Sequence, residues 1–240
     1  MTGTRREELD EALARTEDRI ATACRAVGRA RDEVTLIVVT KFFPAADAAV
    51  LVDLGVRDIG ENRDQEARTK VRELGDLLAG THEMPRVHFI GQAQRNKAGS
   101  IAQYADVVHS VDRHRLAVAL DRGADRAGRT LDVLVQVDLD PVPDIGRGGA
   151  APSDVPALAD AIAEMAHLRL RGVMTVAPLD VDPDASFERL AGLAERVRSD
   201  HPRATWVSAG MSADLESAVR HGATHLRVGT AILGSRPSHR

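Results

Sequence analysis

The chain has 240 residues, of which 43% are hydrophobic, and a formal net charge of −4 at pH 7. Its arginines are interspersed with carboxylates, which excludes a basic tract for nucleic acid, and no stretch approaches the roughly 18 apolar residues of a membrane span. A single cysteine excludes an intrachain disulfide. We expect one domain over residues 1–240, in the cytoplasm, with no nucleic-acid or membrane partner.

The predicted elements alternate along the chain. An amphipathic helix over Arg5–Val27 comes first. Eight β-type runs follow at Val34–Thr40, Val56–Gly60, Val87–Ile90, Asp106–His109, Val133–Val137, Leu168–Met174, Ala204–Val207 and His225–Val228. Helix-period segments between them include Ala45–Leu54, Asp64–Leu78, Arg113–Arg126, Pro156–His167, Asp184–Arg198 and Ala213–Arg220. This alternation predicts an α/β fold with a parallel sheet.

Eight units favour a single (β/α)8 TIM-type barrel with an extra N-terminal helix over an open doubly wound sheet. In such a barrel, the loops after the strands collect at one face and carry the chemistry. Leu139–Ser153, rich in proline, glycine and aspartate, is the best candidate for a mobile loop.

Lys41 is one of three lysines in a chain that has 29 arginines, and it follows the most strand-like run. A lysine amine can lose its proton and attack a carbonyl, which arginine cannot do, and burial favours the neutral amine. Lys41 is therefore a candidate for Schiff-base formation. The alternative is a lysine that extends from a strand end to solvent.

The last two loops contain groups suited to an anion. Barrels often hold phosphate with the loops after strands seven and eight and a helix N-terminus. Ser212 is expected to cap the helix Ala213–Arg220, Gly229 to allow close approach of a ligand, and Thr230 to add a hydroxyl. Ser212 as a plain helix cap remains an alternative, but the joint placement of these residues favours a phosphate site.

One molecule with an aldehyde and a phosphate could join Lys41 to this phosphate site, and pyridoxal 5′-phosphate has both groups. Arg227 could then reach the pyridine nitrogen, where a permanent cation disfavours protonation and weakens the ring as an electron sink. The alternative for Arg227 is a salt bridge at the barrel rim. We expect no metal site, because Gly222 separates His221 from His225 and no acidic or cysteine ligand accompanies them.

Several motifs together resemble the pyridoxal phosphate homeostasis proteins, a family similar to the N-terminal barrel of alanine racemase. The motifs are Val38-Val39-Thr40-Lys41, Gly60-Glu61-Asn62 with Gln65-Glu66, His88-Phe89-Ile90-Gly91 with Gln94 and Asn96-Lys97, Gly172-Val173-Met174, Gly210-Met211-Ser212, and Arg227 to Gly234. The resemblance implies pyridoxal phosphate bound as an internal aldimine on Lys41. It places Asn62 beside the cofactor, Met211, Ser212, Gly229 and Thr230 around the phosphate, and Arg227 at the ring nitrogen.

The departures from the family pattern are modest. Thr40 stands where serine is common, Ala93 where leucine is usual, and Arg147 where lysine is expected. The last of these puts any role of that basic position in doubt. The family signature from His88 to Lys97 has no assigned role, and it could simply shape the loop after the third strand.

The related racemases take a second base, a tyrosine, from an additional β domain and a partner subunit. The only tyrosine here, Tyr104, is expected in a helical stretch before the fourth strand, and the sequence ends soon after Arg227, so we expect that domain to be missing. We therefore expect a monomeric carrier of pyridoxal phosphate in vitamin B6 and amino-acid homeostasis, not an enzyme, with transient transfer to apo-enzymes. A weak racemase is the first alternative, and a Schiff-base aldolase is a less favoured one.

Overall fold

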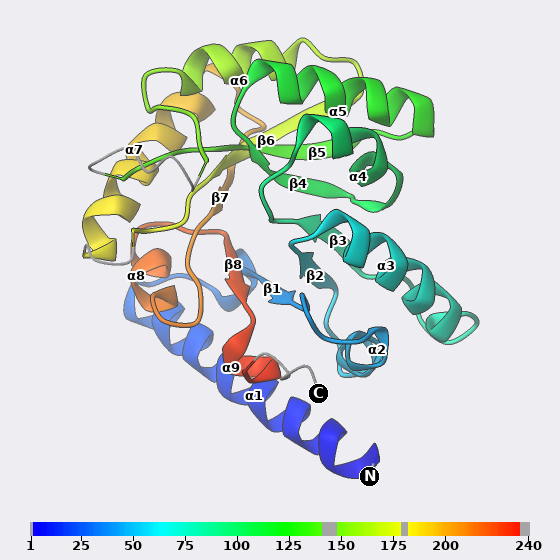
Figure 1. Ribbon diagram of the computed structural model, residues 1–240. Coiled ribbons are helices and arrows are strands. Elements are labelled where there is room, and N and C mark those ends of the chain that lie inside the picture. Colours follow the sequence, from blue (N-terminus) through cyan, green and yellow to red (C-terminus); the bar gives the residue numbers. More distant parts are fainter. Residues whose placement is uncertain (1, 141–147, 179–181, 236–240) are drawn as a thin grey trace.

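The protein is an eight-stranded closed parallel barrel, seen in a computed structural model that describes residues 2–140, 148–178 and 182–235 (Figure 1). The strands pair in sequential order, and β1 closes the barrel by pairing with β8. They are β1 (Thr35–Val39), β2 (Asp58–Glu61), β3 (Arg86–Phe89), β4 (Val107–Val111), β5 (Leu131–Gln136), β6 (Leu168–Met174), β7 (Trp206–Ser208) and β8 (His225–Val228). The predicted barrel is confirmed, and an open sheet is excluded.

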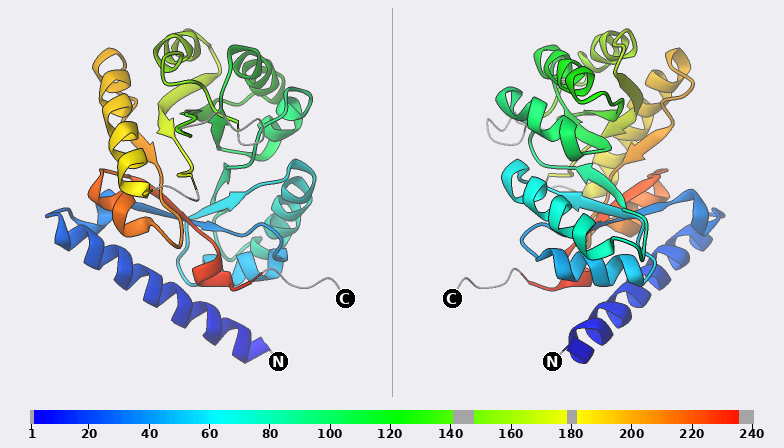
Figure 2. Two further views of the ribbon diagram at one scale, coloured as in Figure 1. Left: turned by 60° about the vertical axis from the view of Figure 1, so that its left-hand side comes forward. Right: turned by 90° about the vertical axis from the view of Figure 1, so that its right-hand side faces the viewer.

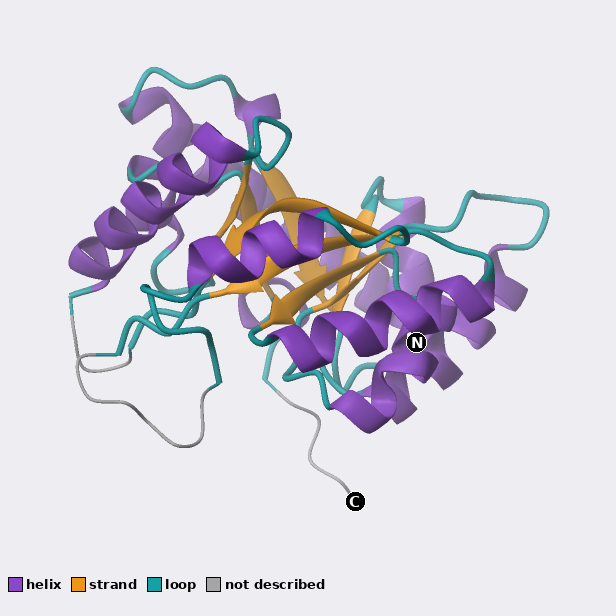
Figure 3. Cartoon of the chain, turned by 90° about the horizontal axis from the view of Figure 1, so that it is seen from above, coloured by secondary structure: helices purple, strands orange, loops and turns teal. Residues whose placement is uncertain are grey.

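Helices surround the strands, as the view from above shows (Figure 3). They are α1 (Thr2–Ala26), α2 (Ala45–Asp53), α3 (Asp64–Leu78), α4 (Ala98–Tyr104), α5 (His114–Ala127), α6 (Val155–Ala163), α7 (Pro183–Asp200), α8 (Leu215–Arg220) and α9 (Thr230–Leu233), with 3-10 turns at Arg31–Glu33 and Arg95–Lys97. Short α9 was not predicted. Within the described ranges, no helix is both long and apolar enough to cross a membrane.

One predicted helix is shorter in the structure, and one predicted loop is only partly described. The helix predicted over Pro156–His167 is too long, because α6 ends at Ala163 and the backbone N–H of His167 donates to Asp121 Oδ1 at 2.9 Å instead of continuing the helix. In the predicted loop Leu139–Ser153, residues 141–147 lie outside the described part, and Arg147 is among them.

The amphipathic pattern explains how the helices attach to the sheet. In α5, Leu116, Leu120 and Ala124 recur every four residues and are fully buried, so they form one face of the helix. The helix then ends at Gly128, whose φ of 64° is the left-handed conformation that glycine adopts at low cost. Similar apolar faces of the other helices meet the outward side chains of the strands.

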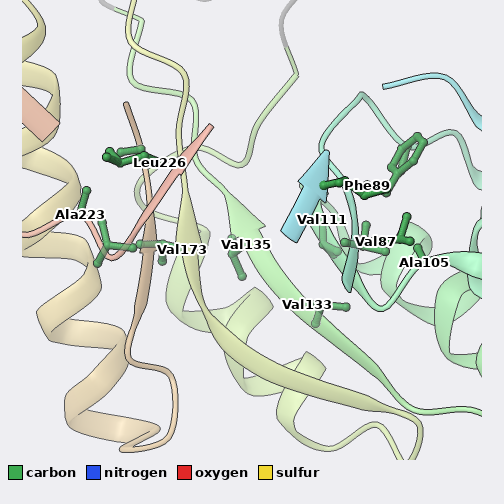
Figure 4. Packing of buried hydrophobic residues seen from close by; sticks show 14 of the residues in the cluster. Val87, Phe89, Ala105, Val111, Val133, Val135, Val173, Ala223 and Leu226 are labelled. Atoms are coloured by element: carbon green, nitrogen blue, oxygen red, sulfur yellow. The ribbon is translucent and has the colours of Figure 1, made fainter. Parts of the chain in front are cut away.

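The main core is therefore a layer between the sheet and the helices. Figure 4 shows part of this layer, including outward side chains of β3 and β5 such as Val87, Phe89, Val133 and Val135. These strands are buried on both faces, as expected for a parallel sheet. The inward side chains form a separate region, which contains a small apolar cluster of Val107, Leu134 and Met174.

The extra N-terminal helix α1 lies across one side of the barrel and packs against α8 and α9 (Figure 2). Arg5 forms a 2.7 Å ion pair with Asp47 of α2 and donates to the Leu233 carbonyl of α9. Arg19 pairs with Glu216 of α8. Helix α1 thus connects the beginning of the chain to the elements that follow the last two strands.

Candidate functional site

Lys41 lies in the turn that follows β1, at the face of the barrel where the loops after the strands collect. Its side chain is partly buried, and its Nζ lies 5.8 Å from the centroid of the Phe42 ring. Phe42 has a φ of 70°, in the left-handed region that residues with a Cβ rarely adopt. Such strain is common beside functional groups, and it sits here directly next to the candidate nucleophile.

A buried polar cluster holds the residue before Lys41. Glu61 Oε1 accepts hydrogen bonds of 2.6 Å from Thr40 Oγ1 and from Lys70 Nζ, and Lys70 also donates to the Thr40 carbonyl at 2.7 Å. Thr40 and Glu61 are fully buried and Lys70 is 7% exposed. Removing one partner of such a pair would leave an uncompensated buried charge. The cluster therefore ties helix α3 to the start of the Lys41 turn.

Asn62 follows β2 and lines a cavity of about 300 Å³ in the barrel mouth. Gly91 allows this placement, because a Cβ there would lie 2.0 Å from the Asn62 carbonyl oxygen. The cavity also has polar walls, which include Gln92, Gln136, Asp138 and Asp140. Lys41 and the predicted phosphate residues are not part of its lining, so Asn62 alone connects the predicted set to this cavity.

Ser212 and Thr230 meet at the ends of β7 and β8. The Thr230 hydroxyl donates to Ser212 Oγ at 3.1 Å, and the backbone N–H of Ala231 approaches the same oxygen at 3.4 Å. Ser212 is partly buried and Thr230 is exposed, so both hydroxyls can reach a ligand. The structure thus brings together the two hydroxyls of the predicted phosphate site.

The prediction that Ser212 caps the following helix is wrong. Helix α8 begins two residues later than predicted, and its N-cap residue is Asp214. Asp214 Oδ1 accepts a 2.6 Å hydrogen bond from the backbone N–H of Met211, which closes a turn ahead of the helix. This turn directs Ser212 toward α9, where its hydroxyl meets Thr230.

Contacts from α1 and β1 hold the two loops that carry the predicted phosphate residues. Both Nη atoms of Arg19 in α1 donate to the Ser212 carbonyl at 3.2 Å. Gly229 lets the end of β8 pack closely on β1, because an added Cβ would lie 3.2 Å from the Val39 carbonyl oxygen. Val39 is two residues before Lys41, so the predicted phosphate residues and the candidate amine follow adjacent strands.

Arg227 is 4% exposed and points its guanidinium at neighbouring strands inside the barrel. Its Nη1 donates to Ser208 Oγ at 2.7 Å and its Nη2 to the Thr175 carbonyl at 2.8 Å. Burial lowers the pKa of Arg227 to about 10, so the group stays charged near neutral pH. These partners are a hydroxyl and a carbonyl, which replace the rim salt bridge considered as the alternative.

A series of hydrogen bonds continues from Ser208 through the barrel interior. Ser208 Oγ lies 2.9 Å from His109 Nδ1, His109 Nε2 lies 2.9 Å from His88 Nδ1, and His88 Nε2 lies 2.8 Å from Asp58 Oδ1. Both imidazoles are fully buried, and this burial lowers the pKa of each. We call Asp58, His88, His109, Ser208 and Arg227 the interior network.

Sequence reasoning missed most of this network, although His88 belongs to the motif without an assigned role. The available signal was the placement of histidines in two neighbouring strands that are otherwise apolar, such as β4 with Val107 and His109. A strand buried on both faces does not reveal which positions point inward. The interior partners therefore became visible only with the barrel register.

The two histidines considered for a metal lie on different elements. His221 follows α8 as its C-cap, and His225 begins β8. Across the described residues, no group of three or more His, Cys, Asp or Glu side chains gathers in a way that could hold a metal ion.

Comparison with known proteins agrees with this architecture. Residues 13–237 match the family described as alanine racemase, N-terminal domain. The pyridoxal phosphate homeostasis protein of Mycobacterium tuberculosis is 47% identical over 97% of this chain and 94% of its own length. Alanine racemase of Clostridium difficile, at 15% identity, shares the fold with a TM-score of 0.71 over 97% of this chain and 58% of its own.

A solved structure is also similar over most of this chain. PipY of Synechococcus elongatus, determined with pyridoxal phosphate bound, has a TM-score of 0.77 and 35% identity, and the match covers 90% of this chain and all of PipY. With the M. tuberculosis protein at 47% identity, these matches settle the family. The chain belongs to the pyridoxal phosphate homeostasis protein family, within the broader alanine racemase N-terminal domain family.

Proposed function

We propose that the chain binds pyridoxal 5′-phosphate through a Schiff base on Lys41 and holds it for vitamin B6 and amino-acid homeostasis, without dedicated catalytic turnover. The observation that carries the proposal is the placement of three suited groups on or directly after the neighbouring strands β7, β8 and β1. These groups are a primary amine, a pair of accessible hydroxyls and a buried guanidinium. The bound pyridoxal phosphate of PipY supports the choice of ligand.

The donor set fits this molecule. Phosphate oxygens accept hydrogen bonds, and the hydroxyls of Ser212 and Thr230 would supply donors, together with backbone N–H groups near Gly229. Lys41 supplies the amine for the aldehyde, with Asn62 on the next strand. Arg227 uses two of its five N–H groups for Ser208 and Thr175, which leaves three for another acceptor.

The charge on Arg227 would act on the bound ring, but it does not by itself decide between storage and turnover, because the related racemases also have an arginine there. Bound pyridoxal phosphate supplies a ring that withdraws electrons, most strongly when its nitrogen is protonated. Arg227 stays charged near neutral pH and donates hydrogen bonds, so it would keep a neighbouring ring nitrogen unprotonated. The ring is then a weaker electron sink.

The position of the only tyrosine disfavours a racemase. Tyr104 ends α4, is 8% exposed, and has its pKa raised by burial. Its side chain belongs to the buried layer between the sheet and the helices, beside Asp64, which disfavours a role as a second base in the mouth. A weak racemase would exchange the α-proton of alanine with solvent deuterium at a rate that depends on Lys41, and a carrier would not.

The test is reduction of the incubated protein with borohydride, followed by peptide mass spectrometry. We expect the pyridoxyl adduct on Lys41, and we expect Lys41→Ala to abolish both the adduct and the yellow absorption band. Lys97→Ala is the matched control, because Lys97 is 48% exposed on another loop and should retain both signals. No adduct, or an adduct on Lys97, would refute the proposal.

Borohydride also separates the aldolase alternative. An aldolase would trap the carbon skeleton of a sugar phosphate on Lys41 without any cofactor.

We further propose that the carrier works in the cytoplasm as a monomer and transfers its cofactor transiently to apo-enzymes. The partial exposure of Lys41 supports the transfer step, because an incoming amine can reach this side chain.

A further inference from the structure

The interior network joins the two ends of the barrel. Asp58 is the first residue of β2, at the end away from the loops that follow the strands, and its side chain is 15% exposed. His88, His109 and Ser208 are fully buried, and Arg227 is 4% exposed. Four hydrogen bonds of 2.7 to 2.9 Å connect these five residues without interruption.

The chemistry of the two ends fixes the direction of every bond once both imidazoles are neutral. A carboxylate only accepts and a guanidinium only donates. His88 therefore donates from Nε2 to Asp58, and as a neutral imidazole it accepts at Nδ1 from His109 Nε2–H. His109 then accepts at Nδ1 from the Ser208 hydroxyl, and Ser208 accepts from Arg227. All the donors point toward Asp58.

A charged His88 would give a different pattern. It would donate from both nitrogens, so His109 would accept at Nε2 and would have to donate from Nδ1 to Ser208. The Ser208 hydroxyl would then accept hydrogen bonds from both His109 and Arg227. The serine proton would then lose its acceptor in His109. Complete burial of His88 lowers its pKa and opposes this arrangement.

We propose that Asp58, His88, His109 and Ser208 act as positioning residues that orient the Arg227 guanidinium toward its ligand through this one-directional network. Each bond polarises the next, so Ser208 becomes a stronger acceptor for Arg227 than an isolated hydroxyl. The negative end of the network lies at the far end of the barrel and the positive end lies under the predicted cofactor site. The consequence for the cofactor ring rests on the proposed function, but the direction of the bonds does not.

The network is suited to orientation and not to proton transport. Moving a proton along it toward Asp58 would require Arg227 to give one up, and its pKa of about 10 opposes this near neutral pH. Arg227 would instead donate steadily to the ring nitrogen from a fixed position.

The first test uses the cofactor-free protein. Nitrogen-15 NMR of the histidine side chains distinguishes the two neutral tautomers, with His88→Gln and His109→Gln for assignment. We expect His88 and His109 both to carry their proton on Nε2. A proton on Nδ1 of His109, or a positively charged His88 at pH 7, would overturn the inference whether or not the protein binds pyridoxal phosphate.

The second test changes the far end of the network. In Asp58→Ala we expect mixed tautomers at His88, a shifted resonance of the ring nitrogen in bound ¹⁵N-pyridoxal phosphate, and about tenfold weaker binding, as for a weakened charge-assisted hydrogen bond. Asp58→Asn keeps an acceptor and should restore the wild-type tautomers. Asp132→Ala is the matched control, because Asp132 is a carboxylate near the start of β5 that pairs with Arg86 and is not one of the five network residues.

The outcomes separate the two proposals. If the wild type forms no adduct on Lys41, the proposed function fails, while the tautomers still test the network. If Asp58→Ala leaves the tautomers and the ring nitrogen unchanged, the positioning role is refuted. If Asp58→Ala does not fold, Ser208→Ala removes only a hydroxyl and should produce the same change in the ring nitrogen, and an unchanged signal there also refutes the role.

Discussion

The layer outside the barrel and the space inside it are both buried, but they differ in chemistry. Between the sheet and the helices one large cluster of buried aliphatic and aromatic side chains dominates, and the Thr40–Glu61–Lys70 cluster is the charged exception. Inside, the small cluster of Val107, Leu134 and Met174 lies beside histidines, Ser208 and Arg227. Burial of apolar surface is enough to stabilise most of the outer layer, whereas each interior polar group depends on a specific partner. We therefore infer that the outer layer mainly stabilises the fold and that the interior network serves the proposed site.

Acid should expose this difference most strongly. Burial lowers the pKa of His88, His109 and His225, the last to about 3. Below about pH 6.5 the unfolded chain binds protons at these histidines while the folded protein does not, so the free energy of unfolding falls as the pH drops. Each group can contribute up to about 1.4 kcal/mol per pH unit. Denaturant unfolding from pH 7 to pH 4 measures this loss.

A matched variant sharpens the acid prediction. His225 makes a tilted ring contact with Trp206, with centroids 4.3 Å apart, and its Nδ1 is hydrogen-bonded to Thr224, so its hydrogen bond is not part of the interior network. His225→Gln should reduce the slope of the free energy of unfolding against pH by up to the contribution of one proton. The tautomer of His109 should remain unchanged. A stability that is flat between pH 6.5 and pH 4 in the wild type would contradict the idea that these histidines are buried in the neutral form.

The outer layer should respond to a lost side chain and not to mild acid. Phe187 of α7 is 2% exposed in the apolar layer, and Phe187→Ala should lower the free energy of unfolding by about 3 to 5 kcal/mol through lost burial and a cavity. Its pH dependence should remain that of the wild type. Leu77→Ala is the control, because Leu77 is 53% exposed. If Phe187→Ala lowered the free energy of unfolding as little as this control does, Phe187 would not be part of the buried layer.

A change at the mouth should have the smallest effect. Ser212→Ala should weaken cofactor retention by about 1 to 2 kcal/mol, as for one hydrogen bond to a charged group, with little change in unfolding of the cofactor-free protein. Equilibrium dialysis against pyridoxal phosphate measures the affinity. Ser235→Ala, a serine beyond α9, serves as the control, and equal affinities of the two variants would remove Ser212 from the phosphate site.

The outer layer could be predicted from the sequence because its signal is periodic. Helix faces such as Leu116, Leu120 and Ala124 recur with the helical repeat, and all eight strands were expected close to their observed bounds. The order of the loops then placed Lys41 and Thr230 at one face. Their roles as cofactor ligands remain predictions.

The interior network and the cluster behind Lys41 could not be predicted in the same way. The partners of Glu61 and His109 come from elements 9 to 99 residues away in sequence, and their pairing depends on barrel closure and on side-chain direction. The cap at Ser212 failed for a local reason, because Asp214 competes for the same turn. A short polar segment offers more than one candidate cap, and only the fold selects between them.

The burial of Lys70 has a practical consequence for chemical labelling. The chain has three lysines, and Lys70 is enclosed by Glu61 and Thr40. An amine-reactive dye would therefore find two accessible ε-amines, Lys41 in the mouth and Lys97 on another loop. Replacing Lys97 by arginine would leave Lys41 as the single reactive side-chain amine, so that a fluorescent aldehyde could report mouth occupancy in real time.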